Sequence, residues 1–426
     1  MMSGLKYPIN VQIEVTEDCN HRCFYCYNLG RSEFSDSKKM SAIDAVAIGR
    51  KIIDEVNPFN ATITGGEPML NMLASISLLR NLGRRGIKCS MNTNLTIANQ
   101  EKLQEIKEAN SHTRFLISVP SVDIDIFEKL TGKKTLPKLF ENLEKIVSLG
   151  FESSVNIVMN SININSIYEI GKFLHQRYGI SAIAATPALR PSSVDSDRSL
   201  FLDNEEVVRG VRQLIKLKDD FGIKVSVLTL LPYCILPEDL RKLEFLRRGC
   251  SAGRTGVQIG YKGDVRSCGH SPLNEGNILT EKFTDIWERM RTYREDNYVP
   301  KECDGCGEVQ YCKGGCRYEG LKTSDEKNSP DSRMVQKLEK SLAQTTEEEF
   351  LDGSRTYKVS AYRIREESLG VYTLFNGHHI LTANDSMLLF MKDIKHSGFR
   401  LNSFPEDVRP IAIKMGKKLK LKGFLK

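Results

Sequence analysis

The sequence predicts an α/β fold: a partly closed (β/α)6 barrel of parallel strands, then a cysteine-rich segment and a small α+β domain resembling a winged helix. Short β-branched runs alternate with amphipathic helical stretches from about Pro8 to about Leu230. Ten of the eleven cysteines fall into spaced groups, and three short strand-like runs precede the last helices. At 426 residues the chain exceeds one ordinary core, so several domains are expected.

The barrel prediction depends on strand and helix signals that alternate along the first 230 residues. Strands are expected at Val11–Val15, Ala61–Thr64, Lys88–Asn92, Arg114–Val119, Ser154–Val158 and Ala182–Thr186. Helices are expected at Ala42–Asn57, Met72–Arg85, Gln100–Ala109, Leu136–Leu149 and Ile167–Tyr178. Because the carboxyl ends of parallel strands share one rim, polar residues that follow strands should meet there.

Three polar features follow the first three predicted strands. They are Cys19-Asn-His-Arg-Cys23-Phe-Tyr-Cys26, Gly65-Gly66-Glu67-Pro68 and Thr93-Asn94. We therefore expect all three at the same rim of the barrel.

The rest of the chain divides into three further parts, giving boundaries at 1–230, 231–333, 334–355 and 356–426. The second part, with Cys234 to Cys316, includes a hairpin at Val257–Cys268 and a helix at Phe283–Tyr293. Residues 334–355 are expected to be a linker, helical or disordered over Glu339–Asp352. The last part is expected to hold strands at Tyr357–Arg365, Val371–Phe375 and His378–Thr382 and helices at Ser386–Ile394 and Val408–Leu421.

Charge and hydropathy exclude several classes of function. No apolar run approaches the ~20 residues of a membrane-spanning helix, and the N-terminus lacks the apolar core of a signal peptide. The net charge is +7, and six lysines lie between Lys414 and Lys426. A basic excess concentrated in a tail indicates a solvated helix more than a nucleic-acid surface. We expect a cytoplasmic protein without membrane or nucleic-acid partners.

The first cysteine group has the spacing C-x3-C-x2-C. Three thiolates on a short loop can hold three irons of a [4Fe–4S] cube and leave the fourth iron open. The alternative is zinc, which needs four closed ligands; the nearest extra donor, His21, lies inside the loop. Bunched cysteines in a reducing compartment favour metal ligation over disulfides.

This loop, with the aromatic Tyr25 before its last cysteine, resembles the radical S-adenosylmethionine (radical SAM) superfamily over about residues 8–230. The resemblance implies that Cys19, Cys23 and Cys26 hold a [4Fe–4S] cluster whose open iron binds S-adenosylmethionine. Reductive cleavage then gives a 5′-deoxyadenosyl radical that removes a hydrogen atom from the substrate.

The second strand's motif, Gly65-Gly66-Glu67-Pro68, matches the GGEP motif of that family. Two glycines let the backbone approach a ligand closely, and a carboxylate suits an ammonium group. Ser118 ends the fourth strand, where the family often places a serine that contacts the ribose. Asn94 either contacts S-adenosylmethionine or finishes its strand.

The second cysteine group resembles the SPASM extension of radical SAM enzymes, which holds one or two auxiliary [4Fe–4S] clusters. By that resemblance Cys250, Cys268 and Cys316 hold the first auxiliary cluster, and Cys234 is expected as its fourth ligand. Cys303, Cys306 and Cys312 would hold the second. A zinc ribbon made of Cys303, Cys306, Cys312 and Cys316 is the alternative.

One departure from the SPASM pattern is that no cysteine follows Cys316. Asp331 stands near the corresponding place, so it is a candidate ligand of the second auxiliary cluster or else a turn or cap residue. Otherwise that cluster has an open iron or is absent. Cys89 is expected to be a buried apolar thiol.

The last part of the chain is similar to the PqqD-like leader-peptide-binding domains of enzymes that modify ribosomally made peptides. Such domains add the leader as an extra strand. His378 and His379 are expected to be edge or turn residues.

Together these features predict a radical SAM/SPASM maturase that abstracts hydrogen from a ribosomally synthesised precursor peptide, with an oxidative cross-link as the outcome. A flavodoxin or ferredoxin would supply electrons. The alternatives are formylglycine formation of the anaerobic sulfatase-maturating type, or a non-catalytic iron–sulfur electron carrier. No residue is singled out as the catalytic base.

Overall fold

The computed structural model describes residues 5–26, 38–189, 200–295, 299–321, 328–335, 337–339, 356–368, 370–376, 380–398, 400, 404–406 and 408–425. The chain forms two compact units, one of Pro8–Ser341 and one of Met1–Tyr7 with Leu342–Lys426. Most of the predicted linker 334–355, and both His378 and His379, lie outside the described residues. Each unit is described separately below.

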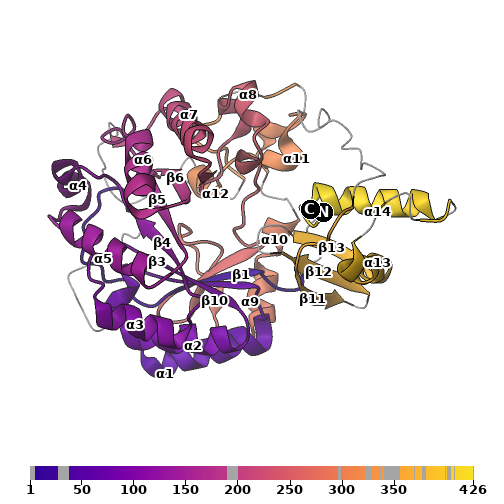
Figure 1. Cartoon of the computed structure of the whole chain (residues 1–426), viewed down its shortest axis with the longest axis horizontal. Helices are drawn as coiled ribbons and strands as arrows, with labels where there is room; N and C mark the ends of the chain where they lie inside the picture. Colours follow the sequence, from indigo (N-terminus) through magenta and orange to yellow (C-terminus); the bar gives the residue numbers. More distant parts are fainter. Residues whose placement is uncertain are drawn as a thin grey trace. The chain divides into compact units, whose positions relative to one another are not determined.

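The large unit is built on one ten-stranded sheet with the order β10-β9-β8-β1-β2-β3-β4-β5-β6-β7 (Figure 1). Its first seven strands are β1 (Asn10–Glu14), β2 (Asn60–Thr64), β3 (Lys88–Thr93), β4 (Arg114–Ser118), β5 (Ser153–Met159), β6 (Ala182–Pro187) and β7 (Lys224–Ser226). They are all parallel in sequence order. The predicted six-stranded parallel barrel is confirmed and gains β7.

At β1, β2 and β3 the sheet presents two chemically different faces, and the apolar one continues into β4. One face is apolar and carries fully buried Val11, Ile13, Ile63, Met91 and Ile117. The other face is polar and only partly buried in the middle of the sheet, where Gln12 pairs in register with Thr62, and Thr62 with Ser90. Because side chains alternate with a period of two, register keeps these polar residues on one face. The apolar face is the core under the helices.

Helices cover the outside of the sheet (Figure 1). They are α1 (Ala42–Lys51) with a π-helical turn at Ile52–Val56, α2 (Met72–Arg84), α3 (Gln100–Ala109), α4 (Ile124–Thr131), α5 (Leu136–Ser148), α6 (Ile167–Tyr178) and α7 (Asn204–Phe221). Side-chain caps fix several starts; Asp203, for example, forms a capping box with Glu206 before α7. Helices α4 and α7 were not predicted, although both have strong N-caps.

The cysteine-rich segment extends the barrel sheet. Strand β8 (Gly256–Ile259) pairs in parallel with β1, and β9 (Asp264–Arg266) and β10 (Gly276–Asn277) continue antiparallel from it. The predicted hairpin at Val257–Cys268 is confirmed, and its pairing with β1 brings it beside the first cysteine loop. Sequence periodicity does not encode this long-range pairing.

Short helical elements complete the large unit. They are Tyr233–Ile235, α8 (Glu238–Arg241), Glu244–Leu246, α9 (Phe283–Arg289), α10 (Arg291–Arg294), Lys301–Cys303, α11 (Val309–Cys312) and α12 (Arg317–Leu321). The predicted helix Phe283–Tyr293 is divided at Met290 between α9 and α10. Among the residues that the structure describes, no helix is both long and apolar enough to cross a membrane.

The small unit holds a separate antiparallel sheet, β11 (Arg363–Ser368), β12 (Val371–Phe375) and β13 (Ile380–Asn384), and two helices, α13 (Asp385–Ser397) and α14 (Arg409–Leu421). Its own core includes fully buried Leu374, Met391, Leu419 and Phe424. The predicted first strand begins six residues later than expected, at Arg363. Beside β11, the backbone N–H of Lys6 donates to Glu367, and Arg365 donates to the carbonyl of Tyr7.

Candidate iron–sulfur active site

The first cysteine loop follows β1 at the carboxyl rim of the sheet. Cys19 is buried, whereas Cys23 and Cys26 are partly exposed. Arg22 closes the loop, because its guanidinium donates to the carbonyls of Cys19 and His21 at 2.6 and 3.0 Å. The three thiols are thus held on one tight loop with two of them accessible to a bound group.

His21, the extra donor within that loop, does not serve as a metal ligand, because its ring contacts the barrel. Its side chain is buried, and Nε2 lies 2.9 Å from the Thr135 hydroxyl and 3.2 Å from the Thr96 hydroxyl. Its ring packs edge-on against Phe127. His21 therefore anchors the loop to the barrel, and the donor set of the loop consists of three thiols, which fits a cube with one open iron.

The two glycines after β2 are required by close approach of the cysteine loop. A Cβ on Gly65 would overlap the carbonyl oxygen of Thr16, and one on Gly66 would overlap that of Asp18. The N–H groups of Gly66 and Glu67 donate to these carbonyls, each at 2.7 Å. The motif therefore packs directly against the strand-to-loop segment that carries Cys19.

Glu67 is fully buried at the centre of this rim. Its carboxylate accepts from the Thr93 hydroxyl at 2.8 Å and from the backbone N–H groups of Asn94 and Met69 at 2.8 and 3.1 Å. Burial raises the pKa of the Glu67 carboxyl to about 6, and these hydrogen bonds oppose the rise. Glu67 thereby joins the ends of β2 and β3.

Glu67→Gln is expected to lower the free energy of unfolding by about 1–3 kcal/mol. The new side-chain NH2 group would replace a carboxylate oxygen that accepts a hydrogen bond, so it would face an N–H or O–H donor. The measurement is urea unfolding of anaerobically reconstituted protein. Glu152→Gln, which removes a charge from an exposed ion pair with Arg114, should change it by less than about 1 kcal/mol. Equal midpoints for Glu67→Gln and the wild type would contradict this role.

Asn94 connects the end of β3 to the cysteine loop. Its Nδ2 donates to Asn20 Oδ1 at 2.8 Å and lies 3.8 Å from Cys19 Sγ. An N–H beside a cluster thiolate is one of the contacts that tune a cluster's potential. Ser118, at the carboxyl end of β4, shares the polar face with Asn156 in register, and Tyr25 packs edge-on against Phe24.

Glu14 is the rim residue that the sequence analysis missed. It is 3% exposed at the end of β1 and forms an ion pair with Arg266 of β9, which also lies 3.4 Å from Asp264. Burial raises the pKa of the Glu14 carboxyl to about 7, and Arg266 opposes the rise. The alternation Asn10, Gln12, Glu14 marks a polar face, but only the β1–β8 pairing reveals the partner. The Glu14–Arg266 ion pair joins the β8–β9 hairpin to β1, the strand that precedes the first cysteine loop.

Arg266→Met is expected to destabilise the protein by about 3 kcal/mol or more at pH 8, because it leaves Glu14 buried and ionised without its counter-charge. The pKa of the Glu14 carboxyl is raised from its ordinary 4.5 to about 7, so the folded state binds this proton more tightly than the unfolded state does. The stability that the proton contributes is fully present below about pH 4.5 and is lost as the pH rises through about 7. The loss should therefore be smaller at pH 6.5. Urea unfolding at both pH values is the measurement, with Arg114→Met as exposed control; a pH-independent loss would contradict it.

The first group of auxiliary cysteines gathers Cys250, Cys268 and Cys316. Removal from water raises the pKa of Cys268 to about 11 and that of Cys316 to about 12, and in both cases the nearby Cys250 adds to the rise. Thiols that are this hard to ionise become thiolates when a metal binds them. Cys250 therefore lies near both Cys268 and Cys316, and that these three residues share a cluster stays a prediction.

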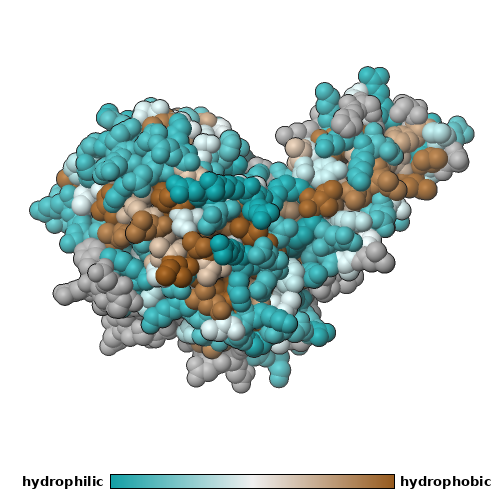
Figure 2. All heavy atoms as spheres, turned by 90° about the horizontal axis from the view of Figure 1, so that it is seen from below, coloured by the Kyte–Doolittle hydropathy of each residue, from teal (hydrophilic) through white to brown (hydrophobic). Residues whose placement is uncertain are grey.

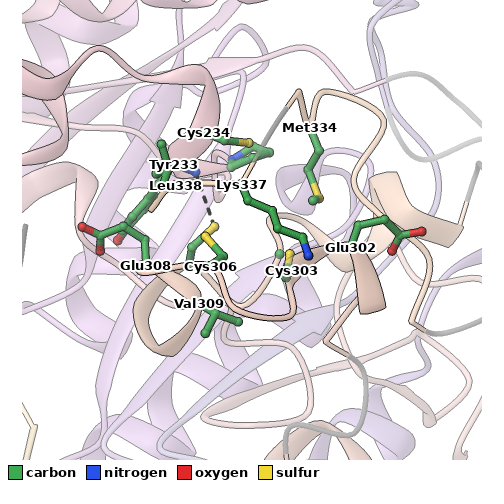
Figure 3. Close-up of a pocket in the computed structure, with 13 residues that line it drawn as sticks. Tyr233, Cys234, Glu302, Cys303, Cys306, Glu308, Val309, Met334, Lys337 and Leu338 are labelled. Carbon is green, nitrogen blue, oxygen red and sulfur yellow. Dashed lines mark hydrogen bonds between the residues drawn. The ribbon is translucent and has the colours of Figure 1, made fainter. Parts of the chain in front are cut away.

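The second group contains four cysteines rather than three. Cys234, Cys303, Cys306 and Cys312 line one small pocket, together with Met334 and Lys337 (Figure 3). The backbone N–H of Tyr233 donates to Cys312 Sγ at 3.4 Å. Cys234 therefore lies with the second group, whereas the sequence analysis expected it beside the first.

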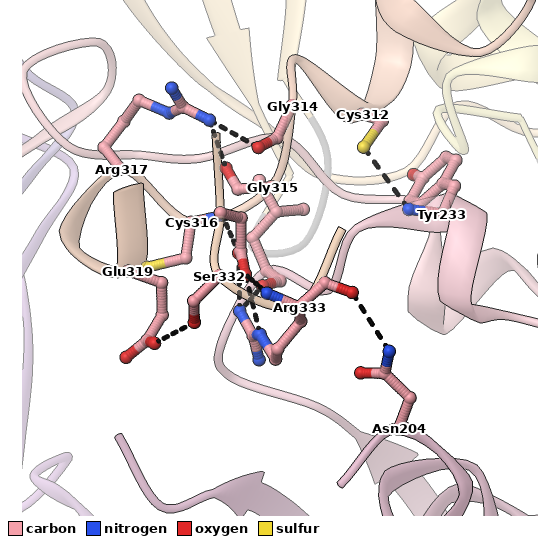
Figure 4. A network of polar contacts seen from close by, with 12 residues as sticks. Asn204, Tyr233, Cys312, Gly314, Gly315, Cys316, Arg317, Glu319, Ser332 and Arg333 are labelled. Atoms are coloured by element: carbon pink, nitrogen blue, oxygen red, sulfur yellow. Dashed lines mark hydrogen bonds and ion pairs between the residues drawn. The ribbon is translucent and has the colours of Figure 1, made fainter. Parts of the chain in front are cut away.

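Asp331 agrees with the alternative of a turn residue, because its Oδ1 accepts from the backbone N–H of Arg333 at 3.0 Å, and it does not lie with the second group. It is beside Cys316, whose backbone N–H donates to Asp331 Oδ2 at 2.7 Å, and it forms an ion pair with Arg333 (Figure 4). Arg333 in turn donates to the carbonyl of Leu230 at 3.1 Å. This network joins the first auxiliary group to the segment that leaves the barrel.

The donor chemistry of the three groups fits iron–sulfur clusters, since all ten residues are cysteines. Within the described part of the chain, no three His, Cys, Asp or Glu side chains are close enough to share one metal ion. Cluster ligands are spaced more widely, around the corners of a cube. Cys89, on the apolar face of β3, is buried and lies 3.5 Å from the Ile87 carbonyl.

The fold and this site define an iron–sulfur enzyme built on a partial barrel. Residues 13–174 match the radical SAM superfamily, and residues 250–307 match the SPASM iron–sulfur cluster-binding domain. The chain belongs to the radical SAM superfamily and is an enzyme with a SPASM domain. Its cofactors are a [4Fe–4S] cluster, S-adenosylmethionine and auxiliary iron–sulfur clusters.

Relatives align over most of the chain. The mycofactocin maturase MftC of Mycolicibacterium smegmatis is 26% identical over 78% of this chain and 84% of its own. The AdoMet-dependent heme synthase of Oleidesulfovibrio alaskensis is 26% identical over 73% and 83%. Streptococcus suis SuiB bound to its precursor peptide SuiA has the same fold, with a TM-score of 0.64 and 18% identity over 78% and 76%.

Proposed function

We propose that this enzyme matures a ribosomally synthesised precursor peptide by abstracting hydrogen from an unactivated carbon, and that it forms an oxidative cross-link. The bound cluster and S-adenosylmethionine supply the 5′-deoxyadenosyl radical. The observation that carries the proposal is the polar face of the sheet, where partly buried Gln12 lies in register between partly buried Thr62 and fully buried Gln258, the latter in the hairpin that precedes Cys268. A substrate on this face would lie between the catalytic and first auxiliary cysteine groups.

The residues of the rim would have separate tasks. Cys19, Cys23 and Cys26 would hold the catalytic cluster, while Gly65, Gly66 and Glu67 fix the loop against which S-adenosylmethionine binds. Tyr25, Asn94 and Ser118 would contact the cofactor. The auxiliary clusters would accept an electron from the substrate, which favours an oxidised product, and a flavodoxin or ferredoxin would reduce the catalytic cluster.

The small unit would bind the leader of the precursor. In the described part of this unit, β13 is a sheet edge bonded only to β12, so an extended peptide can add to it. Hydrophobic side chains gather on the surface of this unit (Figure 2), and α13 and α14 contribute exposed Leu389 and Ile411. Such apolar groups can hold alternate side chains of an added strand. The names of two relatives, a mycofactocin maturase and an enzyme bound to a precursor peptide, support the same substrate class.

The test is to search the reading frames that neighbour this gene for a short precursor peptide, to express that peptide together with the enzyme, and to analyse it by mass spectrometry. We expect the peptide to lose two hydrogens, with fragmentation blocked across the linked residues. A product that reacts with an aldehyde probe would indicate formylglycine formation instead. An unmodified peptide, recovered beside enzyme that cleaves S-adenosylmethionine, would contradict the proposal.

A further inference from the structure

We propose that Cys234 is the fourth ligand of the second auxiliary cluster, together with Cys303, Cys306 and Cys312. The first auxiliary cluster then has only three cysteine ligands, Cys250, Cys268 and Cys316, and its fourth iron is open to a small exchangeable donor. This inference depends on the SPASM domain and not on the identity of the substrate.

The placement of Cys234 is the first argument. It belongs to the short turn Tyr233–Ile235, between the barrel and the hairpin, and lines the same pocket as the three later cysteines (Figure 3). The turn is fixed there, because the Tyr233 N–H donates to Cys312 Sγ and the Tyr233 side chain is 2% exposed. Four thiolates around one pocket are a complete ligand set for a [4Fe–4S] cube.

The hydrogen bonding of Asp331 is the second argument. Oδ1 accepts from the backbone N–H and Nε of Arg333 at 3.0 and 2.9 Å. Oδ2 accepts from Arg333 Nη2 and from the N–H of Cys316, both at 2.7 Å. The side chain is fully buried, and a Cβ on Gly315 would lie 2.6 Å from Oδ2. With four donors on two oxygens, Asp331 positions the backbone of Cys316 and is not free to bind iron.

The number of cysteines in the chain limits which of them can bind the fourth iron of the first auxiliary cluster. Of the eleven cysteines in the chain, three lie on the first loop, four line the pocket and three form the remaining group. The last, Cys89, is buried on β3 and cannot join them. The fourth iron of the first auxiliary cluster therefore has no cysteine left to bind.

The experiment uses full-length chains in which only one auxiliary site remains. Both carry Cys19, Cys23 and Cys26 replaced by Ala. One also has Cys250, Cys268 and Cys316 replaced by Ala, which leaves the second site; the other has Cys303, Cys306 and Cys312 replaced by Ala, which leaves the first. After anaerobic reconstitution each should hold about four irons per chain. Iron analysis and electron paramagnetic resonance (EPR) of the reduced cluster are the readouts.

Cys234→Ala should remove at least about one iron from the second-site chain or change its EPR spectrum, and should leave the first-site chain unchanged. Cys234→Ser keeps the side-chain size and should still shift the second-site spectrum. Met334→Leu, in the same pocket, and Cys89→Ala should be silent in both chains. An effect of Cys234→Ala on the first-site chain alone would overturn the assignment.

Sodium cyanide tests the open iron directly. It should change the EPR spectrum of the first-site chain and leave that of the second-site chain as it was. A first-site chain that responds to cyanide only after Asp331→Asn would mean that Asp331 is a ligand. A first-site chain that never responds would mean that another protein group closes the cluster; either result overturns the open-iron part.

Discussion

A Cys23→Ala variant is expected to form at least about 100-fold less 5′-deoxyadenosine than the wild type. Losing a group that contacts a metal ligand lowers metal affinity or activity by about 10–100-fold, and losing the ligand itself lowers them more. Only three thiols lie on the rim loop, so two cannot hold a cube with one open iron. Liquid chromatography of the quenched reaction, with dithionite as reductant, measures the product.

The control for this variant is Cys89→Ala, which removes a thiol from the apolar face of β3 and should keep wild-type turnover. Iron analysis separates cluster loss from misfolding: Cys23→Ala should lose about four irons per chain and keep those of the auxiliary sites. Substantial 5′-deoxyadenosine from a Cys23→Ala protein would mean that the catalytic cluster lies elsewhere.

Removing Leu342–Lys426 is expected to reduce modification of the full-length precursor by about 100-fold or more, since a tethered leader raises the effective concentration of the core peptide by such factors. Cleavage of S-adenosylmethionine without peptide should stay within about 2-fold, because Pro8–Ser341 is a compact unit with all ten clustered cysteines. Mass spectrometry of the precursor gives the first rate, and chromatography the second.

A point variant makes the same test without truncation. Leu389→Asp places a charge on the exposed apolar surface of α13, where Leu389 is 59% exposed, and should weaken leader binding measured by fluorescence anisotropy. Ile43→Asp makes the same change at an 81% exposed site on α1 and should have no effect. If both the truncated chain and the Leu389→Asp variant turned over the precursor as fast as the wild type, the small unit would have no role in binding the leader. That result would favour a protein-sized substrate.

Local sequence signals were sufficient for the barrel and for the catalytic loop. Apolar and polar residues alternate so regularly in the barrel strands that the predicted limits differ from the observed ones by about one residue. Because sites follow the carboxyl ends of parallel strands, Cys19, Gly66 and Asn94 were expected at the same rim, and they lie there. The role of the glycines was less accessible, because their close contact with Thr16 and Asp18 depends on how two loops pack.

Features that depend on distant pairing were beyond the sequence. The pairing of β8 with β1, the ion pair of Glu14 with Arg266, and the position of Cys234 beside Cys312 each join segments that are far apart in the chain. Cysteine spacing predicts candidate ligands, but it does not say which thiols share a cluster. Helix α7 was not predicted, although Val207, Val211, Leu214 and Leu217 form a buried stripe at helical spacing behind the Asp203 capping box.

The most direct test of the central claim is to reduce reconstituted wild-type protein with dithionite under anaerobic conditions, add S-adenosylmethionine and quantify both 5′-deoxyadenosine and methionine. The account predicts that the two products appear in equal amounts and that both disappear in the Cys19, Cys23, Cys26→Ala chain. Protein that retains its full iron content yet forms neither product would contradict it and would favour an electron carrier.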